Sequence, residues 1–281
     1  MSSDVRKSNI FVLILMYAVV IIFAILAIYP IFWLIIMSFK TTQEFMLTSK
    51  LALPQTWFAG NYPWAWTMGR FGTLTINSII YTSVTIISVI ILSFMAGFAF
   101  AKLPSKWTPL LHGSFIIGIL LVLQSIMVPL FLLINSVGLY NTRLGVLIPY
   151  IGVGLPMAVY LSTEYIKSVP DSVLESARMD GAKYLRIFWS IVMPIASPVA
   201  ATVAIIGVTG TWNEFMLINI LVSSNELKSL PIGINMFSGT LSSDYGKQFS
   251  ALVIGMIPMI VFYAIFRKQI TKGVSAGAVK G

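Results

Sequence analysis

The chain has 281 residues, of which 58% are hydrophobic and 10% charged, with a net charge of +9 and a mean hydropathy of +0.92. A soluble domain of this composition would expose large apolar patches, so the composition excludes a soluble protein and predicts a membrane protein. The positive charge does not gather on one polar element with interleaved aromatic residues, which argues against a nucleic-acid partner. The absence of cysteine excludes disulfides and cysteine-ligated metals.

Long apolar runs predict the fold class. A hydrocarbon core about 30 Å thick is crossed by roughly 20 apolar helical residues. Runs of this kind lie at residues 10–37, 74–101, 112–134, 144–164, 195–222 and 249–266. A transmembrane β-barrel would instead show short segments of alternating polarity. We therefore expect an all-α polytopic membrane protein of about six transmembrane helices, organised as a single transmembrane domain over residues 1–281.

The distribution of charge predicts the orientation. The first run follows Arg6 and Lys7, but it is too long for a signal peptide and lacks a small-x-small cleavage site, so we expect it to be retained. With a cytoplasmic N-terminus, twelve Lys and Arg residues fall on inside segments and six on outside segments. This satisfies the positive-inside rule and places both termini in the cytoplasm.

Two long segments, residues 38–73 and 223–250, are then expected on the outer side. The first is rich in aromatic residues, namely Trp57, Tyr62, Trp64 and Trp66. Trp and Tyr favour the headgroup region of a bilayer, so we expect these rings to anchor the chain there. A protein-binding role is the alternative.

A polar stretch at residues 168–194 separates the fourth and fifth runs. Ser168 and Asp171 have the spacing of a capping box, so we expect a helix to begin at about Pro170. Glu175 and Arg178 can pair on one face of it. Gly181 supplies the left-handed residue that ends a helix.

A second helix is expected from Ala182 onward. Its apolar side chains predict a stripe that faces the membrane: Tyr184, Leu185, Phe188, Ile191 and Val192. A short helix in the membrane plane, tied to two spanning helices, is suited to transmit the motion of a cytosolic partner. The alternative is an amphipathic connector that rests on lipid.

The pattern Glu175-x-Ala177-x-x-Asp180-Gly181-Ala182, followed by Phe188 and Pro194, resembles the EAA loop of the membrane subunits of ATP-binding-cassette (ABC) importers. The resemblance implies that the loop at 168–194 is a cytoplasmic coupling helix between spans 4 and 5, docked on an ATPase subunit. Ser176 stands where the family often has Ala. By position, the ATPase-coupling residues would be Val173, Leu174, Glu175, Ser176, Ala177, Met179, Asp180, Gly181 and Ala182.

The resemblance extends over nearly the whole chain. The run Trp212-Asn213-Glu214-Phe215 and the glycine-rich tail at 272–281 are similar to the carbohydrate branch of these permeases, as in maltose-type and multiple-sugar-type importers. The resemblance implies half of a pathway for a sugar or oligosaccharide, in a bacterial or archaeal plasma membrane, working by alternating access. The implied partners are a second, non-identical permease, two ATPase subunits and an extracytoplasmic solute-binding protein.

We expect no enzymatic activity and no cofactor in this chain. It has no Walker loop, so ATP and Mg²⁺ are expected on the partner ATPase. His112 stands alone, which argues against a metal site. An intramembrane enzyme would need convergent ionisable groups that the spans lack. A permease of the same superfamily for glycerol phosphate, phosphate, amino acids or polyamine is the stronger alternative, although charged substrates favour charged spans.

Polar residues within the runs are candidates for the substrate path. Asn77, Asn213 and Glu214 are expected near the outer face, where they would meet sugar hydroxyls. An equal alternative is that Glu214 pairs locally or holds two helices together. Weaker candidates are Gln124, Asn135 and Asn141. The small residues Ser93, Gly97 and Ala101 recur every four positions, so we expect a close helix contact there.

Overall fold

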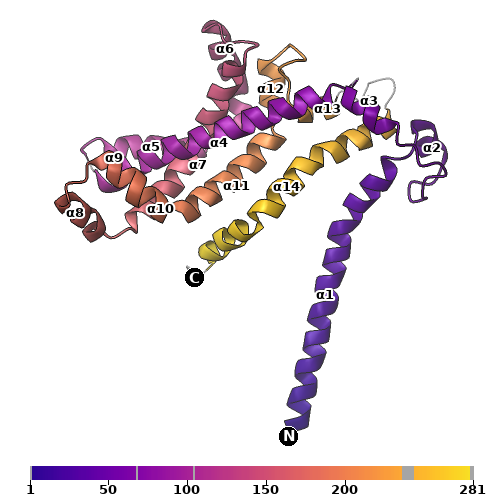
Figure 1. Ribbon diagram of the computed structural model, residues 1–281, viewed down its shortest axis with the longest axis horizontal. Coiled ribbons are helices and arrows are strands. Elements are labelled where there is room, and N and C mark those ends of the chain that lie inside the picture. Colours follow the sequence, from indigo (N-terminus) through magenta and orange to yellow (C-terminus); the bar gives the residue numbers. More distant parts are fainter. Residues whose placement is uncertain (1, 68, 104, 236–243, 279–281) are drawn as a thin grey trace. The chain divides into compact units, whose positions relative to one another are not determined.

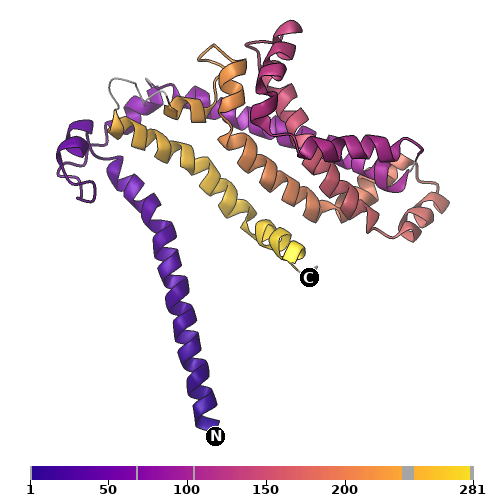
Figure 2. The same ribbon diagram turned by 180° about the vertical axis from the view of Figure 1, so that it is seen from behind.

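The computed structural model describes residues 2–67, 69–103, 105–235 and 244–278, and within these ranges the chain forms helices and loops without a strand (Figures 1 and 2). The four helices long and apolar enough to cross a membrane are α1 (Ser2–Met37), α4 (Phe71–Lys102), α7 (Arg143–Lys167) and α14 (Tyr245–Ala278). Two bent helix pairs raise the number of candidate spans to six. The predicted all-α membrane fold is confirmed.

The bent pairs differ from the continuous runs expected from sequence. In place of one helix at 112–134, α5 (Thr108–Ile119) and α6 (Leu123–Ser136) meet at 110°. Val122, between them, has an extended backbone, which stops the helical hydrogen bonds. Neither Pro nor Gly occupies residues 119–122, so the apolar pattern carries no sign of the break.

The run at 195–222 is also divided. One helical segment consists of α9 (Tyr184–Ile187), the π-helical turn η1 (Phe188–Val192) and α10 (Met193–Ile195), and it meets α11 (Ser197–Asn213) at 74°. A second break, at Glu214, separates α11 from α12 (Met216–Leu221). The remaining short helices are α2 (Thr42–Leu47), α3 (Asn61–Thr67), α8 (Asp171–Met179) and α13 (Leu230–Asn235).

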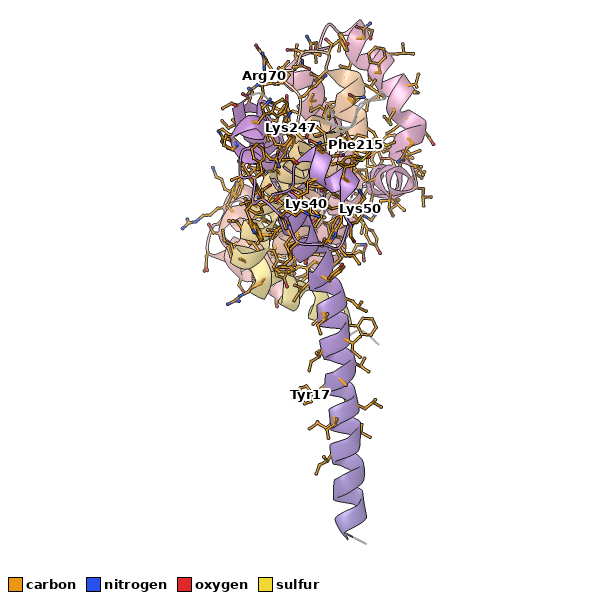
Figure 3. All side chains as sticks on the ribbon, turned by 90° about the vertical axis from the view of Figure 1, so that its right-hand side faces the viewer. Tyr17, Lys40, Lys50, Arg70, Phe215 and Lys247 are labelled. Carbon is orange, nitrogen blue, oxygen red and sulfur yellow. The ribbon has the colours of Figure 1, made fainter. Side chains whose placement is uncertain are left out.

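The chain divides into two compact units, one of residues 1–71 and 234–257 and one of residues 72–233 and 258–281. In the first unit, the side chains of α1 from Val12 to Phe32 are exposed all round the helix (Figure 3). Its 38–67 segment is folded around buried Asn61, whose amide donates to the carbonyl oxygens of Ser38 and Lys40 at 2.8 and 2.9 Å. Trp64 and Lys247 make a cation–π contact at 3.9 Å.

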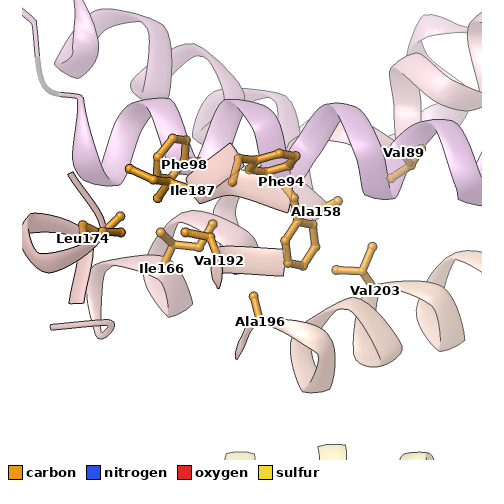
Figure 4. Close-up of a cluster of buried hydrophobic side chains, with 12 residues drawn as sticks. Val89, Phe94, Phe98, Ala158, Ile166, Leu174, Ile187, Val192, Ala196 and Val203 are labelled. Carbon is orange, nitrogen blue, oxygen red and sulfur yellow. The ribbon is translucent and has the colours of Figure 1, made fainter. Parts of the chain in front are cut away.

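The second unit has a buried apolar cluster that joins α4, α7, α8, η1 and α11 (Figure 4). Phe94 and Phe98 come from α4, Ile166 from α7, and Val192 from η1. Between spanning helices such side chains are held by close van der Waals packing, because lipid tails are as apolar as they are. The cluster therefore packs α8 and η1 against the spanning helices.

α4 and α7 approach closely where the small residues lie. The Ser162 hydroxyl donates to the Ser93 carbonyl oxygen at 2.8 Å. A Cβ atom built on Gly97 would lie 2.5 Å from Ser162 Oγ and 3.0 Å from the Thr163 backbone nitrogen. The predicted small-residue contact is confirmed for Ser93 and Gly97.

Replacing Gly97 with Ala is expected to lower the thermal unfolding midpoint of the detergent-purified chain. The added methyl group must push α7 away, and overpacking of this kind costs about 1–3 kcal/mol. Gly113→Ala is the matched control, because a Cβ there has no neighbour within 4 Å. Equal midpoints for the two variants would contradict the close contact.

Candidate functional site

The stretch at 168–194 begins where α7 ends. The Ser168 hydroxyl donates to the Tyr165 carbonyl oxygen at 2.6 Å, so Ser168 closes α7 and does not cap α8 as expected. The cap position of α8 belongs to Pro170, which makes no side-chain cap. The helix nevertheless begins at Asp171, within one residue of the expected start, with the acidic side chain in its first turn.

Lys102, the last residue of α4, holds this first turn. Its Nζ donates to the Val169 carbonyl oxygen at 2.6 Å and to Asp171 Oδ1 at 2.7 Å. The Lys102 side chain is 7% exposed, while that of Asp171 is 75% exposed. Beside the pair lies a cavity of about 230 Å³, which Glu175 and Arg178 also line.

Gly181 ends α8 in the way the sequence predicts. Its φ is +78°, in the left-handed region. The Gly181 N–H donates to the Arg178 carbonyl oxygen and the Ala182 N–H to that of Ala177, both at 2.9 Å. These two bonds form a Schellman motif, which pairs the free carbonyl groups of the last turn.

The predicted coupling residues divide into buried and exposed ones. Leu174 and Ala177 are 3% and 8% exposed, and both belong to the apolar cluster. Met179, at the end of the helix, is 88% exposed. Ala182 is half-buried, and the exposed residues are Val173, Glu175, Ser176, Asp180 and Gly181. The helix thus has one face buried in the cluster and the other exposed.

The segment after α8 differs from the membrane-facing stripe expected there. Tyr184 and Leu185 are exposed, but Phe188 and Val192 are buried in the apolar cluster. The π-helical turn changes the register, so the five residues do not share one face. Arg178 packs over the Tyr184 ring at 4.8 Å from its centroid, and no ion pair joins it to Glu175.

Glu214 lies in the break between α11 and α12. Its carboxylate accepts from the backbone N–H groups of Leu217 and Ile218 at 2.7 and 3.2 Å, and from the Tyr150 hydroxyl at 2.6 Å. The side chain therefore pairs N–H groups that α12 leaves open at its start and joins α12 to α7. These contacts match the alternative in which Glu214 holds helices together.

Asn77 and Asn213 differ in burial and in their hydrogen-bond partners. Asn77 is buried; its amide donates to the carbonyl oxygens of Glu226 and Lys228, and its oxygen accepts from Arg143. Asn213 is exposed and donates to the Thr209 carbonyl oxygen within its own helix. The hydrogen bonds that these two residues and Glu214 make do not join them into one site. Their role in a substrate path stays a prediction.

The weaker candidates also differ in their surroundings. Asn141 accepts from the backbone N–H groups of Ser223 and Ser224 at 3.1 and 2.9 Å, so it fixes the loop after α12. Gln124 and Asn135 are both exposed on α6.

Sequence reasoning missed Lys102 as part of this site. The positive-inside rule places a Lys at the end of a span but says nothing about its partner. Asp171 is 69 residues away, and the Val169 carbonyl group has no side-chain signature. Only the three-dimensional contact identifies the residue.

Residues 93–275 match the family model of the "binding-protein-dependent transport system inner membrane component". Curated relatives include the diacetylchitobiose uptake system permease protein NgcG of Streptomyces coelicolor, which is 31% identical. The match covers 94% of this chain and 88% of NgcG. The multiple sugar-binding transport system permease protein MsmG of Streptococcus mutans is 32% identical, with coverage of 94% of this chain and 96% of the relative.

A solved structure agrees with these matches. It is a bacterial ABC transporter involved in the import of the acidic polysaccharide alginate, and one of its chains superposes with a TM-score of 0.80 at 25% identity. The match covers 94% of this chain and 97% of that one. The family match includes the whole stretch at 168–194 together with α7 and α11. This chain therefore belongs to the family of inner membrane permease components of binding-protein-dependent ABC transport systems.

Proposed function

We propose that this chain is one of two permease subunits of an ATP-driven importer and takes up a neutral sugar or oligosaccharide. Its partners are a second, non-identical permease, two ATPase subunits that bind ATP and Mg²⁺, and an extracytoplasmic binding protein. The family match and relatives named for sugar uptake support this proposal. Both termini and α8 face the cytoplasm of a bacterium or archaeon, as the Lys and Arg distribution favours.

The observation that carries the proposal is the construction of α8. Its apolar face is fixed in the cluster of the second unit, its first turn is bonded to Lys102, and its last turn is closed by Gly181. The polar face, with Glu175, Met179 and Asp180, stays exposed. A helix held in this way moves as a rigid body with the helices that hold it. It is therefore suited to pass the motion of an ATPase into the membrane.

The low charge of the spans favours a neutral substrate. Charged groups in a membrane are costly and mark sites for charged cargo or counter-ions. Within the described spans, Glu214 is bonded to Tyr150 and to backbone, and Glu164 is paired with Lys167 at 2.7 Å. Neither carboxylate is left to bind a cationic substrate. Sugar hydroxyl groups need hydrogen-bonding groups and no full charge.

The composition of the native complex is the first expected result. Purification in mild detergent, followed by measurement of the intact mass, should give this chain with one different permease and two ATPases. ATPase stimulation in the presence of the binding protein, measured with diacetylchitobiose, trehalose and a panel of other neutral sugars, then identifies the substrate. A chain that purifies without any ATPase would contradict the importer function.

Replacing Gly181 with Val is expected to uncouple ATP hydrolysis from sugar uptake while the subunit still inserts in the membrane. A left-handed conformation costs an L-residue roughly 1–2 kcal/mol, and a β-branched residue tolerates it worst, so the end of α8 is distorted. Transport and ATP hydrolysis are measured together in proteoliposomes.

Gly181→Asn is the matched control, because Asn adopts this conformation readily. A Cβ atom at Gly181 has no neighbour within 4 Å, so the two variants differ in backbone preference and not in a clash. Normal sugar uptake per ATP in Gly181→Val would refute the coupling role of α8.

A further inference from the structure

The contact between Lys102, at the end of α4, and the residues at the start of α8 does more than neutralise the charge of Lys102. A buried ammonium group is costly unless it is paired and hydrogen-bonded. Lys102 meets this requirement through one carboxylate oxygen and one backbone carbonyl oxygen, both at the start of α8. The Asp171 end of the pair is open to solvent, whereas Lys102 itself is covered. The two short bonds fix the end of α4 against the residues that lead into α8.

The apolar contacts of α8 pack it against α4 but set no direction of their own. Leu174 and Ala177 lie in a cluster whose attraction is non-directional. Charge-assisted hydrogen bonds, in contrast, depend on both distance and direction. Among the described contacts of α8, the bonds of Lys102 are therefore those that define its position relative to α4.

α4 reaches from this contact to the opposite end of the span. Asn77, Ser78 and Tyr81, near its start, bind the loop at 223–230 through its backbone: Asn77 and Tyr81 donate to its carbonyl groups, and the Ser78 hydroxyl accepts the Leu230 N–H. From Asn77 to Lys102, a helix rises by about 38 Å at 1.5 Å per residue. One rigid element thus joins the start of α8 to a loop at the other end of the span.

We propose that Lys102 is a positioning residue for coupling: it ties the first turn of α8 to α4, so that a displacement of α8 moves α4 and the 223–230 loop that α4 holds. This inference rests on the proposed function, because it takes α8 as the element that the ATPase displaces. Without Lys102, the apolar cluster is the contact that still joins α8 to α4, so the first turn of α8 can move against the end of α4.

The test compares four variants in the reconstituted importer. Lys102→Met removes both bonds and keeps an apolar stem of similar size. Lys102→Arg keeps a cation that can donate to both acceptors. Asp171→Asn removes the charge pair but leaves an amide oxygen and the Val169 carbonyl group as acceptors. Lys106→Met is the matched control, because Lys106 is an exposed lysine four residues further along that packs on Trp107.

Sugar uptake per ATP hydrolysed is measured with the sugar that stimulates the wild-type ATPase most in the panel described above. Lys102→Met is expected to lower this ratio by about fivefold or more, within the usual range of coupling between sites. Lys102→Arg, Asp171→Asn and Lys106→Met are expected to stay within about twofold, because an exposed ion pair contributes little. A merely structural role of Lys102 would reduce uptake and hydrolysis together and leave the ratio unchanged.

A second readout does not depend on the sugar. Spin labels on cysteines introduced at Ser172 and Ser105, both exposed and outside the predicted coupling residues, report the distance between α8 and the residues after α4; the chain has no cysteine of its own. With Lys102 present, the distance is expected to be the same before and after ATP is added. In Lys102→Met, the distribution is expected to broaden or shift with ATP.

The outcomes separate the two proposals. If Gly181→Val uncouples the importer but Lys102→Met keeps both the wild-type ratio and the wild-type distance, the Lys102 inference is wrong and the proposed function stands. If neither Gly181→Val nor Lys102→Met changes the ratio, the coupling role of α8 itself is wrong.

Discussion

Inside a membrane, backbone N–H and C=O groups cannot form hydrogen bonds with water. Where a helix is interrupted, the free backbone groups therefore need hydrogen-bond partners from the protein itself. The second unit meets this requirement with single side chains. Glu214 accepts from the open N–H groups at the start of α12. At the ends of the spans, Asn77 donates to carbonyl groups of the loop at 223–230 and Lys102 to the carbonyl group of Val169. These three polar residues therefore lie where helices break or end.

This arrangement changes how polar residues in the spans are interpreted. A polar or ionisable residue at membrane depth is a functional candidate by default, and Glu214 and Asn77 qualify from sequence alone. Both are occupied by contacts within the chain. The residues of α8 show the reverse case: Glu175 and Asp180 are exposed at the surface, and no bond within the described chain explains why they are there. Function is better argued from the exposed polar residues than from the buried ones.

The sequence predicts the helical class, the end of α8 and the close contact at Gly97, because each has a local physical signature: a long apolar run, a left-handed glycine, a row of small residues. It does not predict the bend at Val122 or the π-helical turn at Phe188, since backbone changes of this kind need no Pro or Gly. The sequence also does not predict the long-range partners of Lys102 and Asn77. They join segments 69 and about 150 residues apart, in part through backbone atoms whose position no residue type reveals.

The all-round exposure of α1 has a consequence for variation in this chain. Within the first unit, the side chains from Val12 to Phe32 are exposed, so no other described helix of that unit imposes a shape on α1. Its helix is maintained by its own backbone hydrogen bonds and by the apolar surroundings of its side chains. Exchanges among Leu, Ile, Val and Phe should therefore accumulate freely in α1, whereas Gly97 of α4, which meets Ser162 and Thr163 of α7, accepts only a small residue. Among homologues, the hydropathy of α1 should therefore be conserved, while its residue identities vary.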